Sequence, residues 1–342
     1  MPAHPAAPVR RALLGFCTVM GTALGTLIAA ATVTMPAAVY AQTSYPNRPV
    51  RLIAPFPPGG TSDVLARLIA AKLSDGLGQI VTVDNRAGAS GNIGHEAAAK
   101  SAPDGYTLLL SNSSTAVTNP HLFKKMPFDP INDFAPIALV ASAGQVLVVH
   151  PSVQATTLAE VTALAKANPG KLNFGSGGKG IQSHISGEMY KSAVGVNIIH
   201  IPYKGTIQAV TDLVAGQIQM VFSDMVPALP QIKAGKLRAI AVTSLQRSAV
   251  LPEVPTMSEA GVPGFDSGVW WSIVAPKGVS NEVVSRVNAE LGKMMQLPEV
   301  RETYAKLGVT TAHSTPAKVT ETIRAESPVM AKILKAAGVE AE

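Results

Sequence analysis

The sequence predicts an α/β protein with two lobes, and three observations support this fold class. Short β-branched runs alternate with longer segments of helical periodicity almost to the end of the chain, a pattern typical of parallel sheets covered by helices. With 47% hydrophobic and 15% charged residues, the chain is too apolar for a disordered polymer. Without its N-terminal segment the chain has about 300 residues, which is at the upper limit for one hydrophobic core, so we expect two lobes.

The N-terminal segment 1–41 has the features of an export signal. Arg10 and Arg11 precede a stretch without charged side chains that ends at Ala41. The stretch is longer than a usual signal core of about 7–15 residues, so an uncleaved membrane anchor is the alternative. Cleavage after Ala41 would remove Cys17, the single cysteine. A thiol-free mature protein suits an oxidising compartment, and we expect the periplasm.

The expected strands are short runs rich in β-branched residues, and the segments between them carry apolar residues at helical spacing. Leu65, Leu68, Ile69 and Leu73, for example, fall on one helix face. The strands are predicted at residues 50–54, 80–84, 106–111, 146–149, 172–174, 198–203, 219–222, 239–243 and 270–275.

Two stretches are predicted to connect the lobes. One is the small-residue segment 141–144, and the other is the Pro- and Gly-rich segment 252–264. Crossing at both places puts residues 42–145 and 266–342 in one lobe and residues 146–265 in the other. Neighbouring crossings form a hinge, and hinged lobes hold their ligand between them.

The loop 54–63 is the most informative candidate site. It leaves a predicted strand and enters a predicted helix at Asp63, with Thr61 or Ser62 as the expected N-cap. Gly59 and Gly60 let the backbone approach a ligand closely. Free N–H groups at the helix start would then hold a carboxylate without Lys or Arg. A tight strand-to-helix turn without ligand is the alternative.

A second glycine-rich loop at 175–180 leads into Ser183, His184 and a predicted helix in the other lobe. Two helix starts from opposing lobes would grip the two ends of a small diacid. The glycine cluster 88–94 matches neither the dinucleotide-binding pattern nor a P-loop. We therefore expect carboxylate binding rather than nucleotide binding.

The sequence offers little for catalysis, metal binding or nucleic-acid binding. No two histidines lie three or four residues apart, and G-x-S-x-G is absent. Asp63 and Asp224 could pair for acid–base work, but Asp is also common in a first helical turn. Lys204 is either a ligand contact or a solvated turn residue. The net charge of +6 is scattered, so we expect no catalytic residue, metal, cofactor or nucleic acid.

A series of motifs follows in a fixed order along the chain. The motifs are YPNRPVR at 45–51, PFPPGGTSD at 55–63, GNIG at 91–94, PDGYTL at 103–108, DFAPI at 133–137, PYKG at 202–205, IKAGKLR at 232–238 and PEVPT at 252–256. In these motifs the chain resembles the Bug family, the extracytoplasmic solute receptors of tripartite tricarboxylate transporters. The resemblance covers residues 45–340.

This resemblance implies a two-lobed fold of the type II periplasmic-binding-protein kind and a small carboxylated ligand in the interlobe cleft. It also implies transporter subunits as partners, and we expect a monomer. A receptor feeding a signalling partner and a secreted α/β enzyme are the alternatives. The ligand-binding residues implied by the matching loops are Phe56, Gly59, Gly60, Thr61, Ser62, Asp63, Ser111, Asn112, Ser114, Gly175, Ser176, Ser183, His184, Tyr203, Lys204, Gly205 and Asp224.

Two positions depart from the family pattern beside the expected cleft. Ala89 and Ser90 stand where more glycine is expected, and Ile207 and Gln208 stand where Gly or Ala with Pro is usual. The identity of the ligand therefore does not follow from the resemblance.

Overall fold

The computed structural model describes residues 45–339 and residue 341. The export signal predicted for residues 1–41 lies outside the described residues. Among the helices of the described part, none combines the length and the apolar character needed to cross a membrane.

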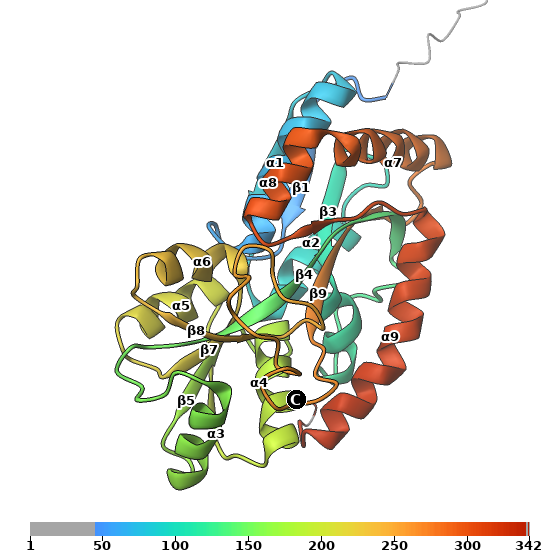
Figure 1. The fold of residues 1–342 in the computed structure, drawn as a ribbon. Helices are drawn as coiled ribbons and strands as arrows, with labels where there is room; N and C mark the ends of the chain where they lie inside the picture. The colour runs from blue at the N-terminus through green and yellow to red at the C-terminus, as the bar shows by residue number, and fades with distance from the viewer. Residues whose placement is uncertain (1–44, 340, 342) are drawn as a thin grey trace, which may run out of the picture. The chain divides into compact units, whose positions relative to one another are not determined.

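A mixed sheet of ten strands forms the centre of the fold (Figure 1), with the order β2-β1-β3-β9-β4-β7-β5-β6 and with β10 and β8 also paired to β4. The strands are β1 (Val50–Ala54), β2 (Val81–Asn85), β3 (Thr107–Asn112), β4 (Phe134–Val149), β5 (Asn173–Ser176), β6 (Ile199–Pro202), β7 (Met220–Asp224), β8 (Arg238–Val242), β9 (Gly268–Pro276) and β10 (Thr310–Thr311). Each predicted strand overlaps one of these, so the α/β class is confirmed.

The prediction of parallel sheets is only partly correct. Strands β1, β2 and β3 run parallel, and so do β5, β6 and β7. Strand β9 is antiparallel to β3 and β4, and β4 is antiparallel to β7 and β8. The antiparallel pairs arise because β4 and β9 carry the chain between the two halves of the sheet, rather than returning through a helical crossover.

Strand β4 divides the sheet into two halves. It pairs with β9 up to Gly144 and with β7 from Gln145 onward. Each half with its helices forms one lobe: the first contains β1, β2, β3 and β9, and the second contains β5, β6, β7 and β8. How far each lobe extends along the chain, predicted as 42–145 with 266–342 and as 146–265, stays a prediction.

The small-residue segment 141–144, predicted to be one of the crossings between the lobes, lies inside β4 at the end of its pairing with β9. A Cβ added to Gly144 would lie 2.8 Å from the Ser244 side chain. Small residues are required here because a neighbouring segment packs closely against the strand. Their composition resembles that of a linker, although the strand continues through them.

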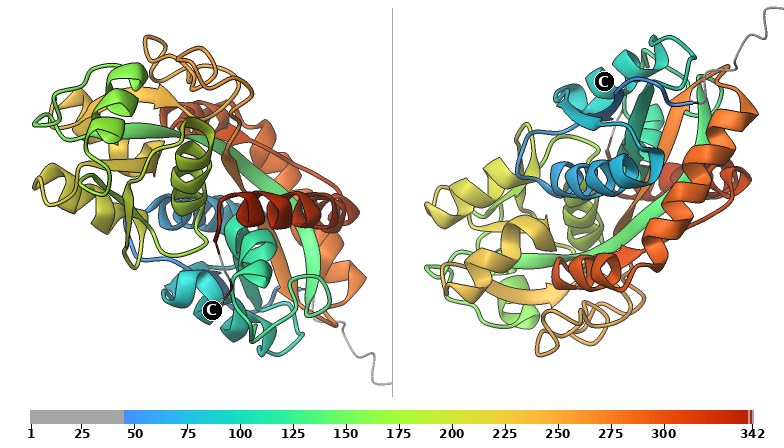
Figure 2. Two further views of the ribbon diagram at one scale, coloured as in Figure 1. Left: turned by 90° about the horizontal axis from the view of Figure 1, so that it is seen from below. Right: turned by 90° about the horizontal axis from the view of Figure 1, so that it is seen from above.

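Helices cover both faces of each half-sheet (Figures 1 and 2). Leu52 and Ile53 of β1, neighbours in sequence, are both fully buried in different apolar clusters, as expected for a strand covered on two sides. The helices are α1 (Thr61–Leu77), α2 (Asn92–Ala99), α3 (Leu158–Ala167), α4 (Gln182–Val194), α5 (Thr206–Val214), α6 (Met225–Lys233), α7 (Asn281–Gln296), α8 (Pro298–Lys306) and α9 (Pro316–Ala336), with short turns η1 (Ala89–Gly91), η2 (Ser114–Thr118) and η3 (Asn119–His121).

The local sequence explains the ends of the helices. Helix α3 begins with a capping box in which Thr157 and Glu160 satisfy each other's backbone N–H groups. Helix α1 buries Leu65, Ile69 and Leu73 and ends at Gly78, whose positive φ of 71° suits glycine. Among the described helices, α3 and α7 have a side-chain cap at the start, whereas the helices that start near the cleft, α1, α4, α5 and α6, have none, and neither do α2, α8 and α9.

Candidate functional site

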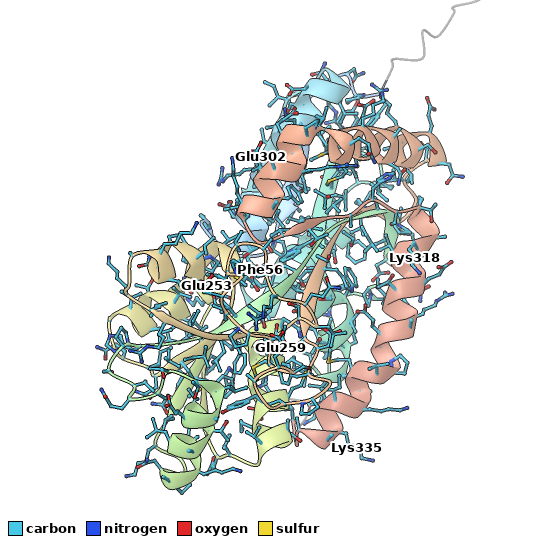
Figure 3. All side chains as sticks on the ribbon, viewed as in Figure 1. Phe56, Glu253, Glu259, Glu302, Lys318 and Lys335 are labelled. Carbon is cyan, nitrogen blue, oxygen red and sulfur yellow. The ribbon has the colours of Figure 1, made fainter. Side chains whose placement is uncertain are left out.

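A cavity of about 40 Å³ lies between the lobes, at the carboxyl ends of the strands. Helices α1, α4, α5 and α6 and the turn η2 each follow one of these strands and start beside the cavity. This edge is where open α/β sheets usually bind ligands. The lining residues are Phe56, Pro57, Gly60, Thr61, Ser62, Asn112, Ser114, Ile181, Gln182, Gly205, Thr206, Ile207, Asp224, Val269 and Trp271; Figure 3 labels Phe56 near the centre of the view.

The first lobe contributes the start of α1. The N-cap is Gly60, not Thr61 or Ser62 as predicted, and the helix begins at Thr61. The two hydroxyls have other partners: Thr61 donates to Asp224 Oδ2 at 3.0 Å, and Ser62 accepts from Trp271 Nε1 at 2.9 Å. The predicted cap is wrong because contacts formed only in the tertiary structure engage both side chains.

The second lobe contributes the starts of α4 and α5. Helix α5 begins at Thr206 after the N-cap Gly205, and α4 begins at Gln182 after Ile181. In these helices and in α1, the N-cap residue makes no side-chain hydrogen bond to the helix start, and the first N–H of α4, that of Gln182, donates to Ser114 Oγ of the first lobe. The first N–H groups of a helix have no partner within the helix.

These helix starts give the cavity an electrostatic preference for anions. Each helix start carries roughly half a positive charge, which resides on the N–H groups that have no partner within the helix. The lining residues, all within the described part, include no Lys, Arg or His. Any attraction for a carboxylate must therefore come from backbone N–H groups and from the hydroxyl and amide side chains.

Asp224 is the acidic side chain in this lining. Strand register places it opposite Gln145, whose Nε2 donates to Asp224 Oδ1 at 3.0 Å. Burial raises the pKa of the Asp224 carboxyl above its ordinary value, and the hydrogen bonds from Gln145 and Thr61 only partly offset this effect. Both partners are neutral side chains, so neither compensates a negative charge fully.

Several hydrogen bonds join the lobes across or beside the cavity. Thr61 donates to Asp224, the Gln182 N–H donates to Ser114 Oγ at 2.9 Å, and Ser90 Oγ donates to the Lys179 carbonyl at 2.6 Å. Ala89 and Ser90 have positive φ angles of 46° and 53°, a conformation that favours glycine. The departure from the family pattern at Ser90 thus coincides with a strained residue that bonds to the other lobe.

Asp63 lies behind the loop rather than in the cavity lining. Its carboxylate accepts hydrogen bonds from the Gly59 N–H, from Arg67 and from Asn85. Burial acts to raise the pKa of Asp63, but these hydrogen bonds outweigh it and hold the pKa below its ordinary value. Asp63 therefore supports the glycine loop as an ionised side chain, which leaves the alternative of an acid–base pair with Asp224 without support from the contacts.

The glycine-rich loop 175–180 is held by a cluster of side chains. Ser183 Oγ accepts from the Gly177 N–H at 3.0 Å, and Ser176 Oγ lies 2.5 Å from His200 Nε2. His184 stacks on His200 with ring centroids 4.0 Å apart. Burial, followed by nearby positive groups, lowers the pKa of His184 to about 3 and that of His200 to about 4. Both rings are thus neutral at pH 7.

The structure brings together some of the predicted ligand-binding residues at the cavity and places the others around it. Those in the lining are Phe56, Gly60, Thr61, Ser62, Asn112, Ser114, Gly205 and Asp224. Those outside the lining are Gly59, Asp63, Ser111, Gly175, Ser176, Ser183, His184, Tyr203 and Lys204. Their assignment as ligand contacts stays a prediction.

Some residues outside the lining have other partners, and one is exposed. Ser111 Oγ pairs with the buried His95 at 2.9 Å, and the Tyr203 hydroxyl donates to Asp212 at 2.8 Å. A Cβ on Gly175 would lie 2.5 Å from Ile218, so that glycine serves close packing. Lys204 is exposed.

Several lining residues were not among the predicted ligand contacts. Ile207 is a position that departs from the family pattern beside the expected cleft, and Thr206 lies between it and the predicted contact Gly205. Val269 and Trp271 belong to β9, which crosses under the cavity. No local pattern indicates which strand passes there. Within the described residues, no group of three or more His, Cys, Asp or Glu side chains is placed to hold a metal ion.

Comparison with known proteins establishes the family. The family model described as "Tripartite tricarboxylate transporter family receptor" matches residues 65–339. The chain belongs to this family. BugT of Bordetella pertussis is 41% identical over 294 residues, which cover 86% of this chain and 89% of BugT, and the predicted Bug-family resemblance is confirmed.

Solved structures support the same assignment for this tricarboxylate transporter family receptor. Rpa4515 of R. palustris, solved with adipate, is 34% identical, with a TM-score of 0.85, and the match covers 87% of this chain and all of that one. The periplasmic binding protein BugD is 35% identical, with a TM-score of 0.84 and the same coverage. The predicted two-lobed binding-protein fold is confirmed.

Proposed function

We propose that this receptor captures a small carboxylated organic molecule in the cavity between its lobes and delivers it to a tripartite transporter in the membrane. The observation that carries the proposal is the meeting of helix starts from both lobes at one cavity, where the N-cap residues Gly60, Ile181 and Gly205 make no side-chain cap. Such starts bind carboxylates. Rpa4515 was solved with adipate, a molecule of this chemical class.

The cavity volume implies that ligand entry requires the lobes to separate. About 40 Å³ holds one to a few water molecules, whereas small-molecule sites usually measure about 300 Å³ or more. We propose that residues 42–145 with 266–342 move against residues 146–265, about a hinge where β4 changes partner between Gly144 and Gln145. Ligand carboxylates would then replace some of the hydrogen bonds between the lobes.

The same proposal includes export of the chain, transporter subunits as its partners, and ligand binding without catalysis. Removal of residues 1–41 would release the mature chain into the periplasm as a monomer, where its partners are the transporter subunits. Asp224 is the titratable side chain in the lining, and its partners are Thr61 and Gln145 rather than a base or nucleophile. These contacts support binding without chemistry.

A thermal-shift screen of the mature chain against organic acids tests the proposal. A ligand that binds only the folded state raises the melting temperature as its concentration exceeds its dissociation constant. We expect one or a few small carboxylic acids to do so. Stabilisation by phosphates or nucleotides alone would reject the proposal.

A further inference from the structure

The cavity wall is rich in donors and includes one carboxylate, Asp224. We propose that Asp224 accepts a hydrogen bond from the ligand, so that this receptor selects carboxylic acids that also carry a hydroxyl or ammonium group over the unsubstituted acids. This inference rests on the proposed function, because it concerns which carboxylic acids the same cavity prefers.

The hydrogen bonds of Asp224 leave part of its acceptor capacity unused. A carboxylate presents about four acceptor positions, two on each oxygen. Oδ1 accepts from Gln145 and Oδ2 accepts from Thr61, each at 3.0 Å. The side chain also lines the cavity. A ligand donor in the cavity would therefore find an acceptor that its present partners have not saturated.

A chain of hydrogen bonds fixes the position of this carboxylate. Gln145 Oε1 accepts from Ser186 Oγ at 2.7 Å, so its Nε2 must face Asp224. Ser186 in turn lies 2.7 Å from Ser267. Gln145 lies in β4 where that strand changes partner from β9 to β7, and Ser267 directly precedes β9. The carboxylate is therefore held in place and does not swing away from an incoming ligand.

The charge pattern of the cavity makes an unsubstituted diacid a poor match for this position. A second carboxylate close to Asp224 repels it, and the repulsion is strong in a partly desolvated cavity. The lining residues, all in the described part of the chain, provide no Lys or Arg to offset it. Burial raises the pKa of Asp224, in keeping with the absence of a compensating cation. A ligand ammonium or hydroxyl replaces repulsion with a hydrogen bond.

Matched ligand series test the inference on the wild-type mature chain. Succinate, malate and aspartate differ only in carrying a hydrogen, a hydroxyl or an ammonium group at one carbon. Glutarate, 2-hydroxyglutarate and glutamate form a second series, and propionate, lactate and alanine a third. Calorimetric titration should give at least tenfold tighter binding for a hydroxyl- or ammonium-bearing member than for the unsubstituted member of the best-binding series.

The Asp224→Asn variant tests whether Asp224 causes this preference. Asparagine keeps the shape but loses the charge and one acceptor oxygen, so the preference should fall to less than about threefold. Asp212→Asn is the matched control: Asp212 belongs to the same lobe and accepts from Tyr203 outside the cavity lining. This control should keep the wild-type preference. Circular dichroism checks that both variants fold.

The results separate the inference from the proposed function. The inference is overturned if, in the screen and in the three series, some unsubstituted acid binds the wild type as tightly as every substituted acid does. Asp224 would then either donate a hydrogen bond as a protonated acid or make no contact with the ligand. A preference that survives in a folded Asp224→Asn protein overturns it as well. Failure of all organic acids to bind the wild type would instead reject the proposed function.

Discussion

At the scale of single residues, the cavity depends on positions where side chains are small or engaged elsewhere. Gly60, Thr61 and Ser62 begin α1 without a side-chain cap, because both hydroxyls contact other segments. The backbone N–H groups of this turn are thereby left for a ligand. Compared with Gly60, a serine or threonine N-cap would have stabilised the helix by only about a few tenths of a kcal/mol, so binding capacity is gained at a small cost in helix stability.

The Gly60→Val variant should weaken ligand binding at least tenfold with little loss of fold. Gly60 lines the cavity, its φ of −81° suits any residue, and the nearest atom to an added Cβ is the Pro57 carbonyl oxygen at 3.6 Å. Added methyl groups would therefore obstruct the ligand without a clash within the protein. Titration of the best ligand from the screen, beside a melting curve, provides the measurement, with Gly60→Ala as an intermediate. Unchanged affinity in the folded valine variant would contradict the role of this loop.

A second residue-scale prediction concerns the buried His95. Burial lowers its pKa to about 4, whereas an unfolded histidine titrates near 6.5. The unfolded state therefore takes up protons first, and stability falls as the pH drops from 6.5 toward 4, by roughly 1.4 kcal/mol per pH unit for each such histidine. His184 and His200 act in the same direction, while Asp224 and Glu326, whose pKa values burial raises, act against it.

Urea unfolding between pH 7 and 5 measures this effect. The His95→Gln variant, although less stable overall, should lose less stability per pH unit than the wild type, because one buried proton acceptor is gone. Equal slopes for the two proteins would show that His95 does not titrate as its burial implies.

At the scale of elements, β9 serves two sides of the sheet with two neighbouring tryptophans. Successive strand residues point to opposite faces. Trp271, only 1% exposed, lines the cavity and donates to Ser62, whereas Trp270 donates to Glu326 of α9 at 2.8 Å. One strand thus supports the start of α1 on one face and binds α9 on the other.

The Trp271→Phe variant should lose about 1–2 kcal/mol of stability and bind ligand more weakly. It removes the indole N–H that bonds Ser62, and the buried hydroxyl loses its donor. Trp270→Phe is the matched control, because it removes an equivalent bond to Glu326 away from the cavity lining. Chemical denaturation and ligand titration of both variants decide the point. Equal losses of affinity would argue against a specific role for Trp271.

At the scale of the whole molecule, α9 links the lobes. It starts beside the first lobe and ends near α4 of the second, and Lys318 and Lys335 mark its two ends in Figure 3. Near its C-terminal end Leu334 packs with Leu122 of the first lobe and Ile185 of α4. This small apolar cluster therefore joins α4 to two segments of the other lobe, and interlobe opening would move α4 relative to both.

The Leu334→Ala variant should cost about 2–4 kcal/mol of unfolding free energy, as truncation of a buried leucine does. Val329→Ala on the same helix is the control: this side chain is 55% exposed, and its change should stay within about 0.5 kcal/mol. Urea denaturation measures both variants. A small effect of Leu334→Ala would mean that the cluster contributes little to holding the lobes together.

Local patterns in the sequence determined the elements of this protein. Alternating β-branched runs and helical periodicity predicted β1 at its observed bounds and the other predicted strands within about two residues, except β4, of which residues 134–145 were missed. Each pattern reflects the burial of one segment against its neighbours. The ordered motifs from 45 to 256 predicted the receptor family. The glycine loop before α1 and the strand end at Asp224 were both predicted as parts of the site.

Only the tertiary structure decided how these parts meet. The bonds between Gln145 and Asp224 and between Ser62 and Trp271 join residues 79 and 209 positions apart, and the bond between Thr61 and Asp224 spans 163 positions. The antiparallel course of β4 and β9 is equally non-local. Periodicity and capping preferences act over a few residues and carry no information on such pairs. Strand register, close packing and the competition for hydrogen-bond partners determine which distant residues pair. These three factors exist only in the folded chain.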